Sequence, residues 1–492
     1  MADYDLAIIG GGLNGVSIAR DAAGRGLRVI LLEQDDLGSA ASSASARLVH
    51  GDLAVLERRG FFRVRAALAE RGVWLRTAPH LVRPMRFVVP AHAEERPPEL
   101  LRAGLWLYDK LAPSGLPKSE TLDVTHHPVG NALKRPFGDA FEYSDCVADD
   151  SRLVVLNAVD AAARGAVIRT GARCVRADRT EFWRLAAIDR GHRTVFSARA
   201  LVNATGAWTG LIAENVLRIP PPRLALRKVS QIVVPKLFDS DNVYVFQNSD
   251  KRLIFASPYA RDFTLIGSVG QLFKGDPAIV AVSVGEIAYL CHAANRYFRQ
   301  QIGPVDVVRA IAGANAVVDD DDKRVARHGA MTFDAGKGRA PLLTLFGGDV
   351  TMSRKRAEIA VTKLTPFYPM SRRWTAKAPL PGGDFAWVSF DDQVDRARER
   401  WRFLSEDQAR RLVAAYGTRV EAVLGNAQSR DDLGPAFGDD LTGAEVRYLM
   451  AQEWARFPDD ILWRRSKLGL TMAPQARDAL AAFMAAAGEG RG

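Results

Sequence analysis

Cysteine and histidine are scarce in this sequence of 492 residues, and neither residue forms a cluster. Cys146, Cys174 and Cys291 are an odd number of widely spaced residues, so the chain has no CxxC metal or redox motif and is typical of a reducing compartment. The eight histidines show no ligand spacing. We therefore expect a cytoplasmic protein without a metal site.

Long apolar runs are also missing, because no stretch of about 18 apolar residues occurs. No segment is therefore expected to span a membrane, and the apolar run that begins at Leu6 has the acidic flank of a strand rather than the features of a signal peptide. With 48% hydrophobic and 25% charged residues, the composition is typical of a globular enzyme with a sizeable core.

The net charge of +10 comes mainly from arginines that are spread along the chain. The sequence has no zinc finger, RNP motif or concentrated basic helix, so no nucleic-acid partner is expected. Two interpretations of the charge remain open. It is either a solvated surface in an arginine-rich proteome or a surface that is attracted to anionic lipid.

The N-terminal segment carries the most informative pattern. An apolar run at residues 6–9 precedes the sequence GGGLNG at 10–15, which predicts a buried strand, a tight turn and a helix that continues to about residue 25. Gly10 allows the turn, Gly12 lets the backbone approach a pyrophosphate, and Gly15 lets helix and strand pack closely. The helix start offers free N–H groups and a positive dipole end to phosphates.

An acidic residue, Glu33, ends the next apolar run, at residues 27–32, and can accept hydrogen bonds from a ribose. Strand, glycine pattern, helix, strand and acid in this order predict a dinucleotide site, with a glycine-rich turn without ligand as the alternative. The candidate residues are Gly10, Gly11, Gly12, Asn14, Gly15 and Glu33.

The segment after Glu33 favours FAD over NAD. Residues 37–47 form a loop of small residues in which Ser42 and Ser43 offer hydroxyls to phosphate or to ring edges, whereas an NAD enzyme more often proceeds into another helix–strand repeat. A flexible Ala/Ser linker is the alternative interpretation.

Two further glycine sites repeat the pattern of an apolar strand followed by a turn. One strand leads into Thr205 and Gly206, where the backbone can pass the adenosine half, and another leads into Gly347-Gly348 and a helix that starts near Thr351. This helix start could face the flavin ring and favour its reduced, anionic form. Each site alone is compatible with an ordinary strand-to-helix turn, but three of them in one chain indicate FAD.

The remaining pattern predicts a sheet layer separate from the nucleotide-binding half, and a Pro/Gly-rich linker at 379–383 before a helical C-terminal part. Nucleotide-binding segments at about 1–80, 145–215 and 335–365 would alternate with substrate segments at about 81–144 and 216–334. Together they form an oxidoreductase region at 1–378, followed by a helical domain at 379–492. The expected strands include 85–90, 166–174, 198–202, 232–234, 243–246, 253–255 and 263–266, and the expected helices 61–79, 99–111, 391–401, 406–416, 444–455 and 474–486.

With these motifs the chain resembles the FAD-dependent, quinone-linked (aerobic) glycerol-3-phosphate dehydrogenases of the glutathione-reductase-like flavoprotein superfamily, nearly from end to end. The resemblance implies an α/β protein with a FAD-binding Rossmann domain, an antiparallel-sheet (α+β) substrate domain and a C-terminal helical domain. The shared motifs are IIGGGLNG (8–15), DAAGRGL (21–27), SSAS (42–45), APHL (78–81), FEYSDC (141–146), NATG (203–206), KGDP (274–277), PLL (341–343) and DILWRRSKLGL (460–470).

The resemblance also implies a chemistry and a set of partners. Hydride would pass from C2 of glycerol 3-phosphate to N5 of non-covalently bound FAD, with dihydroxyacetone phosphate as product and quinone as electron acceptor. The chain would attach peripherally to the inner face of the cytoplasmic membrane, and a homodimer is expected.

The chain departs from the family pattern at polar positions of the substrate pocket. Two family arginines and a lysine are replaced by Ala54, Asn315 and Asp349, and a family histidine by Gln231. Charge-assisted hydrogen bonds contribute roughly 1.5–3 kcal/mol each, so three losses weaken phosphate binding by about 10³- to 10⁶-fold. We therefore expect little turnover of glycerol 3-phosphate compared with other family members.

Three bases remain as catalytic candidates, His50, Lys228 and Asp349. His50 could instead bond the cofactor, and Lys228 could be a surface charge. Asp349 would repel a phosphate dianion.

Three functions stay open on the sequence alone. The first is oxidation of glycerol 3-phosphate, with the phosphate bound by other arginines such as Arg354 or Arg227. The second is oxidation of a neutral or cationic alcohol or amine, with Asp349 as base or counter-ion. The third is an FAD-binding pseudoenzyme that acts as a partner or regulator.

One expected helix, at residues 99–111, is the candidate membrane contact. Its apolar face, followed by Lys110, could lie at a bilayer surface, although such a stripe is also typical of a helix that packs on a core. The face is formed by Leu100, Leu101, Leu105, Trp106 and Tyr108.

Overall fold

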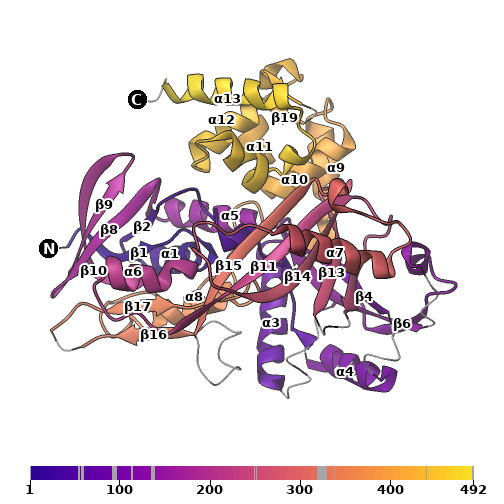
Figure 1. Cartoon of the computed structure of the whole chain (residues 1–492). Coiled ribbons are helices and arrows are strands. Elements are labelled where there is room, and N and C mark those ends of the chain that lie inside the picture. The colour runs from indigo at the N-terminus through magenta and orange to yellow at the C-terminus, as the bar shows by residue number, and fades with distance from the viewer. Residues whose placement is uncertain are drawn as a thin grey trace.

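The structure is a computed structural model that describes residues 2–53, 56, 60–90, 97–111, 115–134, 139–248, 250, 252–318, 330–336, 338–438 and 440–489. Two sheets form the lower body of the molecule in Figure 1, and the C-terminal helices lie above them. The predicted α/β class with an antiparallel layer and a C-terminal helical part is confirmed.

The first sheet is built around β1, in which Leu6, Ala7 and Ile8 are fully buried. β1 pairs in parallel with β2 on one side and with β10 on the other, which explains its continuous apolar run, because both faces of such a strand are covered. The order is β16-β17-β10-β1-β2-β7, and β9 and β8 extend it from β10 as an antiparallel ribbon. The strands are β1 (Tyr4–Ile9), β2 (Val29–Glu33), β7 (Val167–Thr170), β8 (Ala172–Arg179), β9 (Trp183–Asp189), β10 (His192–Asn203), β16 (Met331–Asp334) and β17 (Leu342–Leu345).

Three helices, α1, α5 and α8, share one buried core with this sheet. Helix α1 follows β1 directly, so its N-terminus lies at the carboxyl edge of the sheet, where ligands bind in such folds. The helices around this sheet are α1 (Leu13–Gly24), α5 (Asp150–Ala163), α6 (Thr209–Asn215) and α8 (Ser353–Thr362).

One predicted strand of the first sheet, at residues 166–174, is wrong as a single element. The chain turns at Gly171, whose φ of +70° suits a glycine, and the segment divides into β7 and β8. The long antiparallel strand β9 also escaped prediction, because its alternation of charged and apolar residues is interrupted by a run of small residues.

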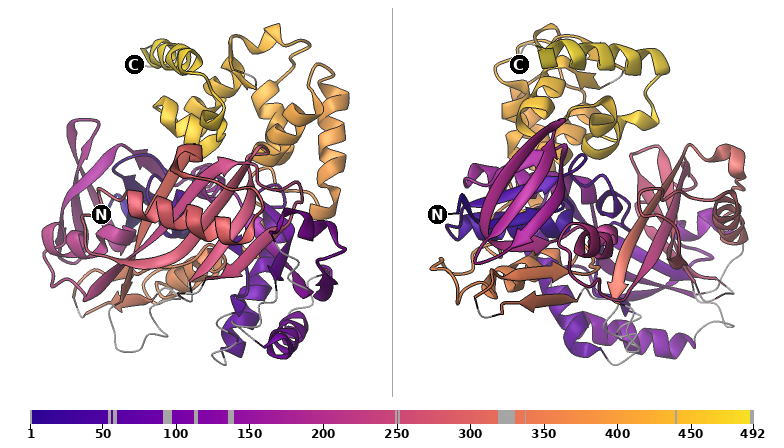
Figure 2. Two further views of the ribbon diagram at one scale, coloured as in Figure 1. Left: turned by 45° about the vertical axis from the view of Figure 1, so that its right-hand side comes forward. Right: turned by 60° about the vertical axis from the view of Figure 1, so that its left-hand side comes forward.

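The second sheet is mostly antiparallel, in the order β15-β11-β14-β13-β12-β4-β6-β3, with β5 beside β6. Side chains alternate between its two faces. Along β12, Val243 and Val245 belong to the core with α3 and α4, whereas Tyr244 and Phe246 belong to the core with α7, which crosses the sheet in the left view of Figure 2. The strands are β3 (Leu48–Val49), β4 (Val82–Pro90), β5 (Glu120–Asp123), β6 (Asp139–Ala148), β11 (Leu224–Pro235), β12 (Val243–Gln247), β13 (Leu253–Tyr259), β14 (Phe263–Phe273) and β15 (Arg309–Val318), and the helices are α3 (Phe61–Thr77), α4 (Pro98–Leu111) and α7 (Val284–Tyr297).

Two short strands lie in a different sheet from the one expected for their part of the chain, which was the nucleotide-binding part for β3 and the substrate part for β16. β3 pairs with β6 in the second sheet, and β16 pairs with β17 at the edge of the first. Strands this short carry too little periodicity to be assigned from sequence.

The C-terminal helices have their own hydrophobic core. The Ser405 hydroxyl accepts the N–H of Gln408 and the Gln408 side chain accepts the N–H of Ser405, a capping box that begins α10 at the expected residue. The predicted helix at 444–455 ends earlier, at Gln452, because Trp454 has a φ of +56°. The helices are α9 (Phe390–Arg400), α10 (Glu406–Tyr416), α11 (Val420–Leu424), α12 (Gly443–Gln452) and α13 (Pro474–Glu489), with a two-stranded ribbon of β18 (Ala436–Phe437) and β19 (Leu441–Thr442).

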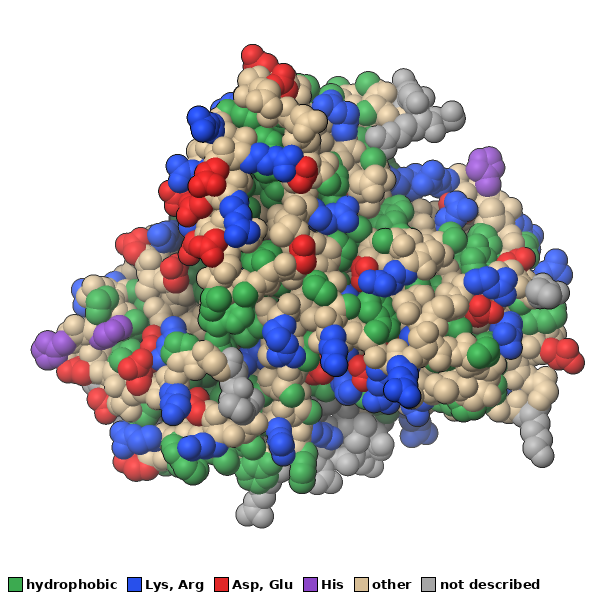
Figure 3. All heavy atoms as spheres, turned by 180° about the vertical axis from the view of Figure 1, so that it is seen from behind, with side chains coloured by type: hydrophobic (Ala, Val, Ile, Leu, Met, Phe, Trp, Pro, Cys, Tyr) green, Lys and Arg blue, Asp and Glu red, His purple; other side chains and the backbone are tan. Residues whose placement is uncertain are grey.

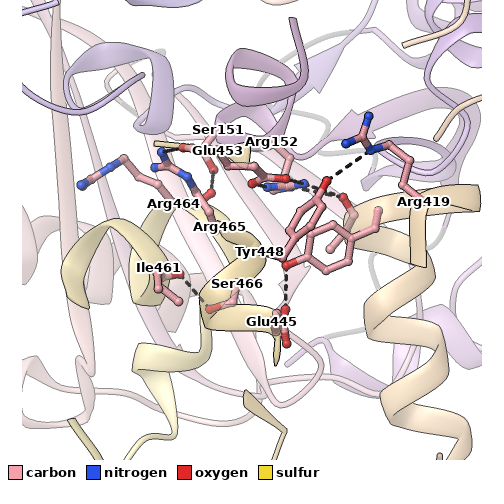
Figure 4. Close-up of polar contacts among 12 residues, drawn as sticks. Ser151, Arg152, Arg419, Glu445, Tyr448, Glu453, Ile461, Arg464, Arg465 and Ser466 are labelled. Atoms are coloured by element: carbon pink, nitrogen blue, oxygen red, sulfur yellow. Dashed lines mark hydrogen bonds and ion pairs between the residues drawn. The ribbon is translucent and has the colours of Figure 1, made fainter. Parts of the chain in front are cut away.

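Buried ion pairs join these helices to the first sheet, as Figure 4 shows. Arg152 of α5 donates to both carboxylate oxygens of Glu453 and to the carbonyl of Ala415, and the side chains of Arg152 and Glu453 are at most 1% exposed. Arg465, in the π-helical turn Asp460–Arg465, donates to Asp36 just beyond β2 and to the Glu453 carbonyl. The interface therefore depends on charges that water does not reach.

Replacing Glu453 by Gln should lower the free energy of unfolding by about 3–5 kcal/mol, because Arg152 stays buried without a counter-charge. Urea unfolding followed by circular dichroism measures the change. The matched control is Glu421→Gln, whose partner Arg400 is exposed, and it should leave the transition nearly unchanged. Equal midpoints for Glu453→Gln and the wild type would contradict the role of this pair.

Candidate functional site

A cavity of about 390 Å³ opens at the carboxyl edge of the first sheet. Its wall brings together all three glycine segments that the sequence singled out: the turn between β1 and α1, the turn after β10 and the turn after β17. The end of β2, the loop before β3, the start of β8, helix α6 and part of β15 complete it.

The first turn needs glycine at its crowded points. Gly10 has a φ of +107°, and a Cβ there would lie 2.6 Å from the carbonyl oxygen of Ala204. A Cβ on Gly15 would lie 1.9 Å from the Gly10 oxygen. Strand, turn and helix are therefore as close as backbones can come, and bare backbone faces the cavity.

Glu33 connects the turn to the end of β2. One carboxylate oxygen accepts the N–H of Gly11 at 2.6 Å and the other accepts the N–H of Asp35 at 2.9 Å. Burial raises the pKa of Glu33 to about 7, with these hydrogen bonds acting in the opposite direction. A Cβ on Gly11 would lie 2.8 Å from the Glu33 Cβ, so Glu33 can occupy this position only because residue 11 has no side chain.

The two serines of the small-residue loop lie at different places. The Ser42 hydroxyl accepts the N–H of Leu13 at 3.0 Å, which satisfies a free donor in the first turn of α1, and Ser42 lines the cavity. Ser43 instead donates to the carbonyl of Ala40 and lines a second cavity on the other side of the loop. In the turn after β10, Thr205 donates to the Asn203 side chain, and Thr205 and Gly206 both line the first cavity.

An arginine that sequence reasoning missed, Arg356, supports the third glycine segment. It donates to the side chain of Asn14 at 2.9 Å, and Asn14 in turn donates to the carbonyl of Gly347 at 3.0 Å. A Cβ on Gly348, where φ is +131°, would lie 1.9 Å from the Arg356 Nη1. The signal in the sequence was an arginine on the apolar face of a helix next to a glycine pair.

Asp349 lies at the start of α8, and its carboxylate is engaged. One oxygen accepts the N–H of Met352 at 2.8 Å, and the other lies 3.6 Å from the Arg356 guanidinium. Arg356 therefore offsets part of the negative charge that Asp349 would present to a phosphate, and its role as base or counter-ion stays a prediction.

His50 lies next to Thr351, which follows Gly347 of the first cavity wall by four positions. Its backbone N–H donates to the Thr351 hydroxyl at 3.0 Å, so the two candidates that the sequence placed far apart are neighbours. The following residue, Gly51, donates its N–H to the Tyr108 hydroxyl at 2.6 Å, and Tyr108 donates to Asp145 at 2.7 Å.

Asp145 is the buried centre of this network. Burial raises the pKa of Asp145, against the opposing effects of Arg71 and His50, and burial also raises the pKa of Tyr108 well above its usual value. The sequence did not predict the contacts among Tyr108, Asp145 and Arg71 and placed Tyr108 on the candidate membrane face, because these contacts join residues far apart in the chain.

Lys228 lies away from the other candidates. Its ammonium group forms an ion pair with Glu286 of α7 at 2.7 Å and donates to the Ala281 carbonyl, on the α7 side of the second sheet. Lys228 does not line the first cavity, and a catalytic role for it stays a prediction. Arg354, proposed above as a phosphate ligand, is buried against Glu70 and Glu358, while Arg227 is exposed. Ala54 lies outside the described residues.

Known families and proteins match this arrangement over nearly the whole chain. Residues 5–354 match the FAD dependent oxidoreductase family, and residues 373–491 match the C-terminal domain of alpha-glycerophosphate oxidase. A glycerol-3-phosphate dehydrogenase of Pseudomonas aeruginosa is 44% identical over 98% of this chain and 95% of its own length. A D-erythritol 1-phosphate dehydrogenase of Brucella abortus is 42% identical over 96% of each chain.

The fold is also that of a solved structure, the glycerol-3-phosphate dehydrogenase of Bacillus halodurans complexed with FAD, with a TM-score of 0.76 and 23% identity over 99% of this chain and 91% of that one. The residues around the cavity fit FAD as well, since bare glycine backbone, a helix N-terminus and an acid at the end of β2 are what its phosphates and ribose require. This chain therefore belongs to the FAD-dependent glycerol-3-phosphate dehydrogenase family, and FAD is its cofactor.

Proposed function

We propose that this protein is a quinone-linked dehydrogenase that oxidises the C2 hydroxyl of glycerol 3-phosphate to a ketone. The observation that carries the proposal is the match over 98% of the chain to the Pseudomonas aeruginosa relative of that name. The match extends through both the oxidoreductase part and the C-terminal part. The erythritol-phosphate relative supports the wider substrate class, a phosphorylated polyol.

The first cavity supports a division of the cofactor contacts among its walls. The turn of Gly10 and Gly12 would hold the pyrophosphate, Glu33 the adenosine ribose, and Gly347 the flavin end. When bound, FAD supplies the acceptor for the hydride that leaves C2. The chain's own task is then to orient the alcohol and to remove its proton.

His50 is the residue that we assign to proton transfer. Its backbone is fixed by Thr351, and Asp145 lies near enough to interact with it electrostatically. Histidine is the most frequent general base in enzymes, and a neighbouring carboxylate stabilises the imidazolium that forms. With Lys228 held by Glu286 and Asp349 held by Arg356, His50 is the base that the geometry favours.

Weak phosphate binding at the family positions remains part of the proposal. Asn315 of β15 lines the first cavity with a neutral amide, and the charge of Asp349 is offset by Arg356. The second function, oxidation of a neutral or cationic alcohol or amine, gains no support from Asp349, because its carboxylate already contacts the Met352 N–H and the Arg356 guanidinium. A homodimer stays a prediction of the resemblance.

A surface patch on α3 and α4 supports attachment to a bilayer, where a quinone is dissolved. Phe62 is 89% exposed, Leu100 61% and Trp106 62%, whereas Leu105 and Tyr108 of the same helix face are buried. Exposed cations lie beside them, and the Lys110 ammonium lies 5.8 Å from the centroid of the Trp106 ring. Figure 3 shows hydrophobic and basic side chains together along the lower edge of the molecule.

A helix that spans a membrane needs a certain length and apolarity. Among the residues that the structure describes, no helix is long and apolar enough to cross a bilayer. The patch therefore supports contact with one surface only, with apolar side chains at the headgroup level and cations near anionic lipid.

The first test concerns the cofactor. Gly11→Ala should weaken FAD binding by about 10- to 100-fold, because the added methyl displaces Glu33 and its hydrogen bond to the turn. Fluorescence titration of the apoprotein with FAD measures the affinity. Gly104→Ala in α4, where a Cβ meets open space, is the matched control and should bind FAD as the wild type does.

The second test concerns the substrate. High concentrations of glycerol 3-phosphate should bleach the bound flavin under anaerobic conditions, and His50→Asn should slow the reduction by about 10²- to 10⁴-fold. Lys228→Met is the control and should reduce at the wild-type rate. A flavin that stays oxidised at every substrate concentration would contradict the proposed function, and equal rates for His50→Asn would contradict the assigned base.

The third test concerns the membrane. The protein should sediment with anionic vesicles at low salt, and Trp106→Glu should weaken binding by about tenfold or more, as expected for losing one large apolar contact. Val305→Glu changes an exposed valine on another element and should bind normally with FAD retained. Protein that stays in the supernatant with anionic vesicles would exclude this surface.

A further inference from the structure

A second cavity, of about 230 Å³, lies on the other side of the loop that walls the cofactor cavity. Ser39 and Ala40 line both cavities, so the loop separates them by the thickness of one chain. Its remaining wall comes from the loop before β3, the start of α5, the second sheet, the segment before α7, and the C-terminal π-helical turn with the residues just after it. The charged and larger polar members are Arg47, Asp150, Gln231, Tyr259, Arg309, Arg464 and Lys467.

Four cations face one carboxylate in this wall, and three of the cations have partners. The Lys467 ammonium binds Asp149 at 2.5 and 2.7 Å. Arg464 binds Asp36 and Asp460, and Figure 4 shows it extending away from the Arg152–Glu453 pair. Arg47 lies 3.7 and 3.9 Å from the carboxylates of Asp149 and Asp150, beyond hydrogen-bond distance, and its guanidinium lies over the Tyr259 ring.

Arg309 is the exception. Its side chain forms neither an ion pair nor a hydrogen bond with any residue that the structure describes, and its guanidinium lies 3.5 Å from the centroid of the Trp463 ring. Burial lowers the pKa of Arg309, Tyr259 and Asp459 oppose that shift, and Arg464 adds to it. A guanidinium has five N–H donors and stays charged, so Arg309 can still bind an anion.

Arg309 lies on the same strand as Asn315, one of the positions at which the family pattern has a cation and this chain does not. Arg309 and Asn315 are an even number of positions apart in β15, so their side chains lie on the same face of the sheet. Asn315 lines the cofactor cavity without a charge, whereas Arg309 lines the second cavity with one. The hydroxyl of Tyr259, in the same wall, also has no hydrogen-bond partner within the described part of the chain.

We propose that this second cavity binds a phosphate-type oxyanion, with Arg309 as its main ligand and Arg47, Arg464 and Tyr259 as further donors. Planar guanidinium groups match the oxygens of phosphate in pairs, and several donors around one small space suit a tetrahedral dianion. The anion is either the phosphate group of the substrate or a separate phosphorylated ligand. The proposal does not depend on turnover.

The test is a calorimetric titration of the FAD-loaded protein with inorganic phosphate at constant ionic strength. The wild type should bind phosphate, and Arg309→Gln should weaken binding by about tenfold or more, as expected for one lost charge-assisted contact. Arg477→Gln is the matched control, because Arg477 also approaches the Trp463 ring but lies outside the cavity wall, and it should bind phosphate as the wild type does.

Two results would overturn the proposal: a wild type that binds no phosphate, or an Arg309→Gln variant that binds it as tightly as the wild type. FAD content and thermal midpoint show whether each variant is folded. If the glutamine variant does not fold, Arg309→Lys serves instead. It keeps the positive charge but loses the planar guanidinium, so it should bind phosphate with an intermediate affinity.

Competition between glycerol 3-phosphate and inorganic phosphate identifies the source of the anion. If glycerol 3-phosphate displaces phosphate and Arg309→Gln weakens both, the site binds the phosphate of the substrate. If phosphate binds in the presence of saturating glycerol 3-phosphate, the site serves a separate ligand. Because binding is measured without turnover, a flavin that glycerol 3-phosphate does not reduce would contradict the proposed function and leave the anion site standing.

Discussion

The carboxylate of Asp36 is the point on which both cavities depend. It lies just beyond Glu33, at the beginning of the loop that walls the cofactor cavity on one side and the basic cavity on the other, and Arg464 and Arg465 of the C-terminal part bind it. Burial opposes ionisation of Asp36, but the two guanidiniums hold its pKa below the usual value. A charge buried in this way is stable only with its partner, so the C-terminal helices are part of the cofactor site although they do not line it.

Side chains tie the first and third glycine segments together, and the second packs against the first through its backbone at Ala204. Glu33 binds the first turn, Asn14 reaches from the first turn to Gly347, and Arg356 holds Asn14 from α8. Each of these contacts joins a side chain to backbone or to another side chain that is fixed by packing. A cofactor that lies along this row therefore meets a surface whose shape is already set, which reduces the ordering that binding requires.

The sequence predicts the parts of the site that are local and fails where the site is not local. The turn after β1 and the acid at the end of β2 follow from glycine spacing and strand length, so they were found with their neighbours. Arg356, Tyr108 and Asp145 act through partners far away in the chain, which no spacing reveals. The sequence could not place Lys228 relative to the cavity, because strand alternation shows which residues share a face but not where that face lies, and the irregular register between Lys228 and Ser230 adds to the ambiguity.

The order of the strands has a consequence for how the protein is made. β1 pairs with β2 soon after both are made, but its other neighbour is β10, so one edge of the first strand to leave the ribosome waits for a partner about 190 residues later, and β10 in turn waits for β17. Asp36 waits longer still, for Arg465. A nascent chain therefore carries the glycine turn before the walls of the cofactor cavity have all been made. Until β10 has been made, the unpaired edge of β1 is open to pairing with other chains.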